Sequence, residues 1–321
     1  MRDRPRTMRD ALLERIVDRM AEDPKILFVS ADFGAPRLDT LRRGFAQRFV
    51  NVGIAEQNLI NVSAGLALEG FVVYAYAIAP FISMRPYEQI RNNLAMLAQT
   101  RDINVNLISV GAGVSYEVSG PTHHCLEDLA IMRTLPNMAF LSASDSQISA
   151  AFVDYTIRHS GPKYVRLDAK ALPCIQNQVE QEDLDQGYRE LVRGQEICIV
   201  STGYMSHKAL RVAKHMNGTN HPPVGAIDLF VLEPLSEDAL WTTLSRYKTI
   251  VTLEEGFVGR GGLDCLVRDL VARRGPGRRV RALGFPSRYL FEICNREALH
   301  RLCGLDHDSI IRAISDLSVS E

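Results

Sequence analysis

Residues 48–58 read Arg48-Phe-Val-Asn-Val-Gly-Ile-Ala-Glu-Gln-Asn58 and carry the strongest fold signal in the chain. The apolar run that begins at Phe49 predicts a strand, Gly53 ends it, and a helical pattern follows. This arrangement brings the carboxylate of Glu56 to the first turn of a helix. A carboxylate in that position is stabilised by the helix dipole, and taken alone this explanation is sufficient.

Short apolar runs alternate with helical segments through the first half of the chain. Because these runs lack a strict alternation of polar and apolar residues, they are typical of parallel strands covered by helices on both faces. Strands are predicted at residues 26–30, 49–53, 72–76, 105–110, 138–142 and 164–167. Helices are predicted at residues 7–21, 56–69, 83–99, 126–134 and 146–158. We therefore expect a doubly wound α/β domain.

A second α/β series follows a polar stretch. From residue 171 to residue 186 the hydrophobic pattern lapses into Gln, Glu and Asp, which is typical of an interdomain linker. Further strands are predicted at residues 197–201, 224–229, 249–253 and 280–283. With 321 residues the chain can bury two cores. We expect two doubly wound α/β domains: a mostly parallel-sheet domain over residues 1–170, a linker over 171–190 and a smaller domain over 191–321.

Composition excludes several classes of protein. The net charge of −1 offers no long-range attraction for nucleic acid or an anionic membrane. No apolar run approaches membrane-spanning length and the N-terminus is charged, so we expect neither a transmembrane helix nor a signal peptide. The six cysteines include no CxxC pair, and His123 and His124 lack partners at metal-ligand spacing, so no metal ligand is predicted. We expect reduced thiols and a cytoplasmic location.

Several blocks occur in the order found in the transketolase group of thiamine-diphosphate enzymes, which the chain resembles along nearly its whole length. They include Ser30-Ala-Asp-Phe-Gly34, residues 51–57 and 75–95, Ser119-Gly-Pro-Thr-His-His-Cys-Leu-Glu-Asp128, Gly161-Pro-Lys-Tyr-Val-Arg166, Asp228-Leu-Phe-Val-Leu-Glu-Pro-Leu235 and Val251-Thr-Leu-Glu-Glu255. Several ordered matches are more specific than any single one. The resemblance implies a pyrimidine-binding domain followed by a transketolase C-terminal-like domain.

The resemblance assigns roles in cofactor binding to four residues. In this group the glutamate that matches Glu56 hydrogen-bonds a ring nitrogen of the cofactor's aminopyrimidine, which lets the cofactor deprotonate its own thiazolium carbon. Phe81 or Ile82 matches the side chain that stacks on the aminopyrimidine, although a buried core phenylalanine is an alternative reading of Phe81. Asp32 matches an acid of the first strand near the dimer seam, with a helix or turn cap as the alternative.

Four residues make up the expected substrate site. His123 matches the histidine of the family's Gly-Pro-Thr-His loop, where an imidazole can hydrogen-bond substrate and move protons near neutral pH. Related synthases place an arginine at the position of Arg85, facing substrate. Ser119 and His124 flank the same loop motif. An ordinary polar loop residue is the alternative for His123, and a solvated salt bridge is the alternative for Arg85.

Two departures from the family pattern narrow the expected substrate. Typical transketolases place an aspartate before Gly-Pro-Thr-His, where it reads a sugar hydroxyl, but this chain has Ser119. The family's Arg-Pro-Ala-Asp segment, whose arginine grips a sugar phosphate, reads Leu141-Ser-Ala-Ser-Asp145. Either the acceptor is not an ordinary sugar phosphate, or another residue such as Arg85 holds it. A specialised biosynthetic pathway is therefore expected.

The elements that hold the cofactor's diphosphate do not occur in this sequence. Whole transketolases carry a preceding domain with a Gly-Asp-Gly motif and a downstream asparagine, which bind Mg²⁺ and the diphosphate. The resemblance therefore implies a split enzyme in which the diphosphate is bound by a separate protein, an N-terminal transketolase-like subunit. Thiamine diphosphate and Mg²⁺ would lie between the two subunits, and an α2β2 heterotetramer with self-association of this chain is expected.

Three functions are compatible with the resemblance. The first is a split transketolase subunit that moves a two-carbon ketol unit from a ketose donor to an acceptor. The second is the β subunit of a 2-oxoacid dehydrogenase or decarboxylase, which delivers an acyl or ketol unit to a lipoyl or carrier protein. The third is a non-catalytic assembly subunit. The loop Gly120-Pro-Thr-His-His124 favours the first, and the presence of both Glu56 and His123 argues against the third.

Overall fold

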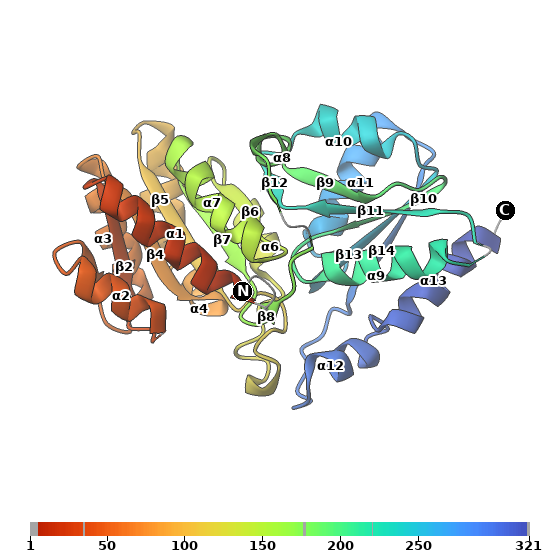
Figure 1. The fold of residues 1–321 in the computed structure, drawn as a ribbon, viewed down its shortest axis with the longest axis horizontal. Coiled ribbons are helices and arrows are strands. Elements are labelled where there is room, and N and C mark those ends of the chain that lie inside the picture. Colours follow the sequence, from red (N-terminus) through yellow and green to blue (C-terminus); the bar gives the residue numbers. More distant parts are fainter. Residues whose placement is uncertain (1–5, 35, 176–177, 220, 320–321) are drawn as a thin grey trace. The chain divides into compact units, whose positions relative to one another are not determined.

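The computed structural model describes residues 6–34, 36–175, 178–219 and 221–319. Its contacts divide the chain into two compact units, each with its own sheet. The first unit contains the residues up to Ala112, Ile131–Glu180 and Val231–Pro234, and the second contains Gly113–Ala130, Gln181–Phe230 and the residues from Leu235 onward (Figure 1). Both units are α/β, and the predicted fold class is confirmed.

The first unit has a seven-stranded sheet of order β12-β6-β7-β5-β4-β2-β3, in which only β12 runs antiparallel to its neighbour. The strands are β2 (Ile26–Ser30), β3 (Phe49–Asn51), β4 (Val72–Ile78), β5 (Asn104–Val110), β6 (Ala139–Ser142), β7 (Lys163–Leu167) and β12 (Val231–Glu233). Strands β2, β5 and β7 are buried along their whole length, because helices cover both faces of the sheet. The six strands predicted in this half are present, with ends shifted by one or two residues.

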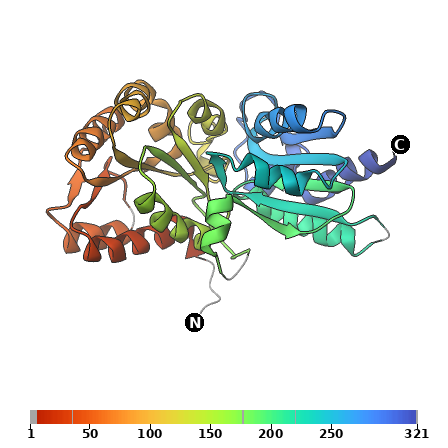
Figure 2. The same cartoon turned by 90° about the horizontal axis from the view of Figure 1, so that it is seen from above.

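The helices of the first unit form two layers. They are α1 (Met8–Glu22), α2 (Pro36–Gly44), α3 (Glu56–Leu68), α4 (Ala79–Met84), α5 (Tyr87–Ile90), α7 (Ser146–Arg158) and the end of α6 (Asp128–Arg133). Figure 2 shows α1 and α7 on one face of the sheet and α3 on the other. Thr7 starts α1 by accepting the Asp10 N–H at 3.1 Å, and Asp145 starts α7 by accepting the N–H groups of Gln147 and Ile148.

The helix predicted at residues 83–99 is a series of shorter segments, so this prediction was wrong in detail. After α4 and α5 come a π-helical turn (Arg91–Met96) and a 3₁₀ turn (Leu97–Gln99). Pro86 separates α4 from α5, because proline has no N–H group to continue the helical hydrogen bonding. Helix α4 begins at Ala79, so Phe81 lies in its first turn and Arg85 directly follows its last residue.

The second unit has a five-stranded sheet of order β14-β13-β10-β11-β9, with β9 antiparallel to β11 and the other pairs parallel. The strands are β9 (Tyr188–Val192), β10 (Ile197–Ser201), β11 (Val224–Leu229), β13 (Thr249–Phe257) and β14 (Arg279–Phe285). The helices are α8 (Gln181–Gln186), α9 (Met205–Asn217), α10 (Glu237–Leu244), α11 (Leu263–Arg274), α12 (Arg296–Leu302) and α13 (His307–Val319). Helices α9 and α13 cover one face of this sheet, and α10 and α11 cover the other (Figures 1 and 2).

The segment Gly113–Ala130 packs with the second unit, although it precedes α7 in the sequence. Val114 and Leu126 belong to the same apolar core as residues of β10, β13 and α9. Within the expected linker the structure has β8 (Ala171–Leu172), which pairs with β1 (Arg6–Thr7), and the helix α8. The domain limits at residues 170 and 190 stay predictions.

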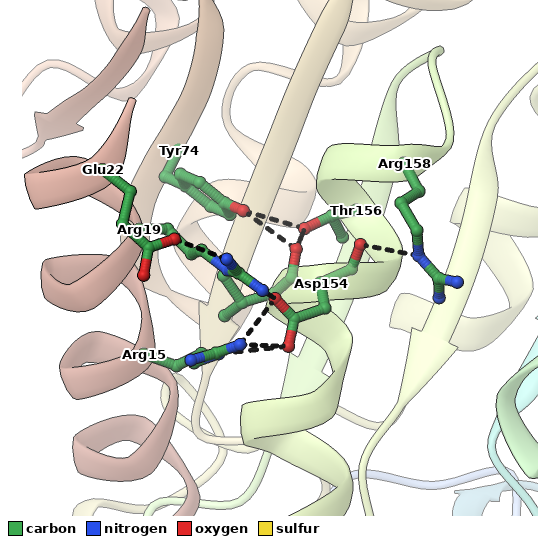
Figure 3. Close-up of polar contacts among 8 residues, drawn as sticks. Arg15, Arg19, Glu22, Tyr74, Asp154, Thr156 and Arg158 are labelled. Carbon is green, nitrogen blue, oxygen red and sulfur yellow. Dashed lines mark hydrogen bonds and ion pairs between the residues drawn. The ribbon is translucent and has the colours of Figure 1, made fainter. Parts of the chain in front are cut away.

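Ion pairs join α1 to α7 in the first unit (Figure 3). Asp154 on α7 accepts hydrogen bonds from Arg15 Nη2 at 2.8 Å and from Arg19 Nε at 2.7 Å. Two residues later, Thr156 Oγ1 lies 2.9 Å from the hydroxyl of Tyr74 on β4. Burial raises the pKa of Tyr74, so this hydroxyl stays neutral. Polar contacts therefore link α1, α7 and β4 in addition to their apolar packing.

Asp154→Asn should lower the free energy of unfolding by about 1 kcal/mol in low salt, because two arginines lose the carboxylate that they share. The loss should shrink at high salt, where exposed charges are screened. Denaturant unfolding of the purified chain at two salt concentrations measures both effects. Asp18→Asn, on the exposed side of α1, is the control and should change little. Equal destabilisation at both salt concentrations would contradict an ionic role.

Candidate functional site

Glu56 is the first residue of α3, and it is 3% exposed. The residue before it, Ala55, provides no side-chain cap for the helix. Glu56 lies in the first turn of α3, where the helix dipole favours a negative charge. Its two oxygens lie 3.3 and 3.1 Å from Nη1 of Arg85. Because a buried carboxylate requires a compensating group, Arg85 is its counter-ion.

The turn from β3 into α3 is held by a short chain of hydrogen bonds. Gly53 has φ +75°, a conformation that favours glycine, and its N–H donates to Asn51 Oδ1 at 2.9 Å. Asn51 Nδ2 in turn donates to Asp32 Oδ1 at 2.7 Å. Asp32 follows β2 and itself has φ +59°. Asp32 thus supports the turn that delivers Glu56 to its position, through Asn51.

Aromatic rings border the Glu56–Arg85 pair. The guanidinium of Arg85 lies 4.5 Å from the centre of the Phe81 ring, which stacks on Phe33 at 6.4 Å. The side chain of Arg85 is 52% exposed, and Phe81 is half-buried, whereas Ile82 is fully buried. Phe81, and not Ile82, therefore borders the pair. Phe33 was not singled out from the sequence. The available signal was its position directly after Asp32, in the turn that follows β2.

This group of side chains can bind one kind of ligand well. A buried carboxylate accepts a hydrogen bond from a protonated ring nitrogen, and a half-buried phenylalanine offers an apolar face to a planar ring. The exposed cation between them can move, because half of its surface is in solvent. The arrangement suits a planar, nitrogen-containing ring.

The loop that carries His123 lies in the second unit. Its ends pair through two backbone hydrogen bonds between Gly113 and Cys125, of 3.0 and 2.8 Å. Inside the loop, the carbonyl of Gly120 accepts the N–H groups of His123 and His124 at 3.0 and 3.2 Å. Thr122 Oγ1 lies 3.0 Å from Nδ1 of His123, which orients the imidazole. The loop is therefore closed, and its half-buried imidazole stands two residues before the closing residue Cys125.

The other predicted residues of this loop differ in accessibility. Ser119 is exposed, and its N–H donates to the Tyr116 carbonyl at 2.9 Å. His124 is 4% exposed, with Nε2 3.4 Å from the carbonyl oxygen of Glu117. Burial lowers the pKa of His124, so its imidazole is neutral at pH 7. Ser119 is exposed to solvent and His123 is partly exposed, whereas His124 is buried.

The residues singled out from the sequence fall into two groups. Those in the first unit are Asp32, Glu56, Phe81, Ile82 and Arg85, and those in the second are Ser119, His123 and His124. The structure brings Glu56, Phe81 and Arg85 together, with Asp32 supporting the turn before them. Their individual roles stay predictions.

Two further observations concern metals and membranes. Among the residues that the structure describes, no three or more His, Cys, Asp or Glu side chains are grouped so that they could hold a metal ion. Within the same residues, every helix is too short or too polar to cross a membrane.

Comparison with known proteins gives the family. Residues 4–174 match the transketolase pyrimidine binding domain, and residues 187–310 match the transketolase C-terminal domain. This chain belongs to the transketolase family. The resemblance inferred from the ordered sequence blocks is confirmed. A pyrimidine-binding domain of this kind implies a thiamine-diphosphate-dependent family.

Members of the transketolase family match most of the chain. One of the subunits of the apulose-4-phosphate transketolase of Actinobacillus succinogenes is 28% identical over 311 residues, which cover 96% of each chain. The 6-deoxy-6-sulfo-D-fructose transketolase subunit SqwH of Clostridium sp. is 29% identical, and the match covers 81% of this chain and 80% of that protein. A solved structure described as a split gene transketolase, inactive beta4 tetramer, has a TM-score of 0.82 and 30% identity, with 97% of each chain covered.

Arg85→Met should lower the free energy of unfolding at pH 7 by about 1–2 kcal/mol, because it leaves the buried Glu56 carboxylate without its cation. Adding Glu56→Gln in the same chain removes that charge and should recover most of the loss. A cycle of the two single variants, the double variant and the wild type measures the coupling. Arg91→Met, at an exposed position of the same helical run, is the control. Strictly additive losses would contradict the pairing.

Proposed function

We propose that this chain is the pyrimidine-binding and C-terminal subunit of a split transketolase, which transfers a two-carbon ketol unit from a ketose donor to an acceptor. The observation that carries the proposal is the buried Glu56 at the start of α3, beside the half-buried Phe81. It lies within the matched pyrimidine-binding domain. The relatives from Actinobacillus succinogenes and Clostridium sp., each named as one subunit of a transketolase, support the same proposal.

The residues of the first unit fit the pyrimidine part of thiamine diphosphate. When bound, that cofactor supplies the carbon nucleophile for breaking and forming the carbon–carbon bond. Glu56 would accept a hydrogen bond from a protonated ring nitrogen, and Phe81 would pack against the ring face. Arg85 would yield one oxygen of the Glu56 carboxylate to that nitrogen. Its guanidinium, 52% exposed, is free enough of packing to turn toward the substrate.

A second subunit would hold the rest of the cofactor. Magnesium binds carboxylate and carbonyl oxygens together with phosphate oxygens, and the described residues of this chain offer no acidic cluster for it. We therefore assign the diphosphate and Mg²⁺ to a partner that resembles the N-terminal half of transketolase. Two relatives are named as single subunits of their enzymes, and the similar split gene transketolase is named as a beta4 assembly. The subunit names support a second kind of subunit, and the beta4 name supports self-association of this chain; the α2β2 stoichiometry stays a prediction. The cytoplasmic location stays a prediction.

His123 would move protons to and from the substrate. A neutral imidazole can accept a proton at one ring nitrogen and donate one from the other, and the contact of Nδ1 with Thr122 orients the ring. His124 is buried in the loop and would help to position His123, because the backbone N–H groups of both residues donate to the Gly120 carbonyl. Ser119 is exposed in the same loop, at the place where typical transketolases carry a hydroxyl-reading aspartate.

The substrate would be an anionic ketose whose acidic group is bound by a different residue from the arginine that binds the sugar phosphate in typical transketolases. In the segment that replaces the phosphate-gripping motif, Asp145 is 2% exposed and accepts the N–H groups of Gln147, Ile148 and Ile175, so its carboxylate serves the backbone. Arg85 is then one cation that could bind an acidic substrate group. Two relatives are named for a sugar phosphate and for a sulfonated sugar, so relatives differ in the anion of their substrate. A specialised biosynthetic pathway is consistent with this variation.

Reconstitution tests the proposed function. The purified chain, its proposed diphosphate-binding partner subunit, thiamine diphosphate and Mg²⁺ should together transfer a ketol unit, whereas neither of the two proteins should do so alone. Glu56→Gln should assemble normally but turn over at least about 100-fold more slowly, because an amide does not stabilise a protonated ring nitrogen. Ketose phosphates and 2-oxoacids are compared as donors in one assay, with assembly followed by size-exclusion chromatography. Turnover of 2-oxoacids alone would replace the transketolase assignment by that of a 2-oxoacid dehydrogenase subunit.

Ser119→Asp should move the donor preference toward ordinary phosphorylated ketoses, because it restores the carboxylate that reads a sugar hydroxyl in typical transketolases. The measurement is the ratio of kcat/KM for two donors in the wild-type and variant complexes. Affinity for thiamine diphosphate should stay unchanged. Thr40→Asp, at an exposed position of α2 in the first unit, is the control substitution. An unchanged ratio would mean that Ser119 does not face the substrate.

A further inference from the structure

The second unit contains a buried ionic cluster that the proposed mechanism does not use. Glu255 on β13 is 3% exposed, and its carboxylate accepts hydrogen bonds from Arg296 Nε and Nη2 at 2.7 and 2.5 Å. His300 Nε2 lies 2.6 Å from the same carboxylate. Burial by itself raises the pKa of Glu255, but Arg296 and His300 outweigh burial and hold that pKa below its ordinary value. The carboxylate is therefore charged, and it joins β13 to α12.

Lys208 on α9 forms the second layer of the cluster. Its ammonium lies 2.6 Å from His300 Nδ1 and 3.0 Å from both the Glu297 carboxylate and the Leu305 carbonyl. Because an ammonium only donates, His300 accepts at Nδ1 and carries its proton on Nε2, facing Glu255. A neutral imidazole agrees with the pKa of His300, which burial lowers. The cluster is thus a connected network from β13 through α12 to α9.

The Glu255 carboxylate also contacts the loop of residues 113–125, which carries His123, at the point where the loop closes. Its Oε2 accepts the N–H of Val114 at 3.2 Å. Gly113 has φ +61°, and a Cβ at this position would lie 1.9 Å from the same oxygen, so the close approach requires glycine. Gly113 is hydrogen-bonded to Cys125, the residue at which the loop closes. One carboxylate therefore contacts the point where both ends of the loop meet.

The chain segment leading into Arg296 contacts the same loop at a second place. A Cβ at Gly120 would lie 3.3 Å from Cδ1 of Ile293. Tyr289 is hydrogen-bonded to Glu127, whose charge raises the pKa of the tyrosine. The segment from Tyr289 to Arg296 thus provides the counter-ion of Glu255. It also contacts the loop at Gly120 and the residue Glu127 that follows the loop.

Stability alone does not require this polar cluster. Burying charges is costly, and apolar side chains of similar volume would fill the same space at a lower cost of desolvation. The charged groups do fix an orientation. A carboxylate that is bound by a bidentate arginine and by an imidazole can adopt only one orientation. The remaining oxygen lone pair then points at a fixed place, and in this unit that place is the N–H of Val114.

We propose that Glu255 is a positioning residue: through Val114 and Gly113 it sets the position of the loop 113–125, and with it the orientation of His123 and Ser119 toward the substrate. The catalytic part of this inference rests on the proposed function, whereas the anchoring of the loop does not.

The neighbouring residue Glu254 provides a matched control. It is 1% exposed, and its carboxylate accepts the N–H groups of Leu263 and Asp264 at 3.0 and 3.1 Å, at the start of α11. It is as buried as Glu255 and lies on the same strand, but its hydrogen bonds cap the N-terminus of α11 and do not involve the loop. Glu254→Gln should therefore affect stability without affecting the loop.

Hydrogen exchange in the isolated chain tests the anchor independently of any activity. Glu255→Asp keeps the charge but shortens the side chain by one methylene, and it should speed exchange in a peptide covering residues 113–125 by about tenfold or more. Gly113→Ala is a second route, since its methyl group would clash with the Glu255 carboxylate and separate it from the Val114 N–H, although Glu255, Arg296 and His300 are not mutated. Glu254→Gln should leave exchange in this peptide as in the wild type. Wild-type exchange in the loop of both folded test variants would overturn the anchor.

Kinetics of the reconstituted complex test the positioning role. Glu255→Asp should lower kcat about tenfold with unchanged affinity for thiamine diphosphate, because small displacements of a proton-transfer group are costly. In a His123→Ala background the same substitution should lower kcat by less than about twofold, since its effect passes through His123. The positioning role would be overturned if Glu255→Asp lowered kcat by the same factor in the His123→Ala background as in the wild type. An equal loss of kcat in Glu254→Gln would also overturn it. If the wild-type complex shows no ketol transfer, the proposed function fails, and the exchange experiment alone decides whether Glu255 anchors the loop.

Discussion

A charged carboxylate buried at the first turn of α3 is the constraint around which the first unit's candidate site is organised. Glu56 is 3% exposed, and a charge so far from water needs a compensating partner. Arg85 provides it at 3.1 Å, from the end of α4. Two chain segments must therefore meet: the turn from β3 into α3, supported by Asp32 through Asn51, and the short helix that ends before Pro86. Phe81 borders the pair as a consequence, because it lies one turn before Arg85 on the same helix.

The second unit contains a buried carboxylate with a different physical character. Both Glu255 and its partner Arg296 are enclosed, with side chains 3% and 8% exposed, whereas the partner of Glu56 is 52% exposed. An exposed cation can turn away when a ligand donor takes its place at the carboxylate, because water then solvates the guanidinium. An enclosed pair has no such replacement, so it holds its geometry. The first carboxylate is suited to exchange partners with a ligand, and the second is suited to hold a loop still.

Much of the fold was predictable because its signals are local. Apolar runs of four to six residues identified most strands of the two sheets, and the blocks around Glu56 and His123 identified the family. The exceptions have physical causes. Strand β12 has three residues, too few for a periodic signal, and α2 is short and mostly polar, so neither was predicted. The helix expected at residues 83–99 is divided because Pro86 interrupts its hydrogen bonding.

The sequence by itself determined the order of the elements, the family and the residue types available for chemistry, because these follow from composition and spacing over a few neighbouring positions. Only the tertiary structure decided which charges meet. Arg85 lies 29 residues from Glu56, and Val114 lies 141 residues from Glu255. It also decided that the segment Gly113–Ala130 packs with the second unit, although it stands in the sequence between elements of the first. Contacts over such separations depend on how whole sheets and helices pack, and no local pattern of side chains contains that information.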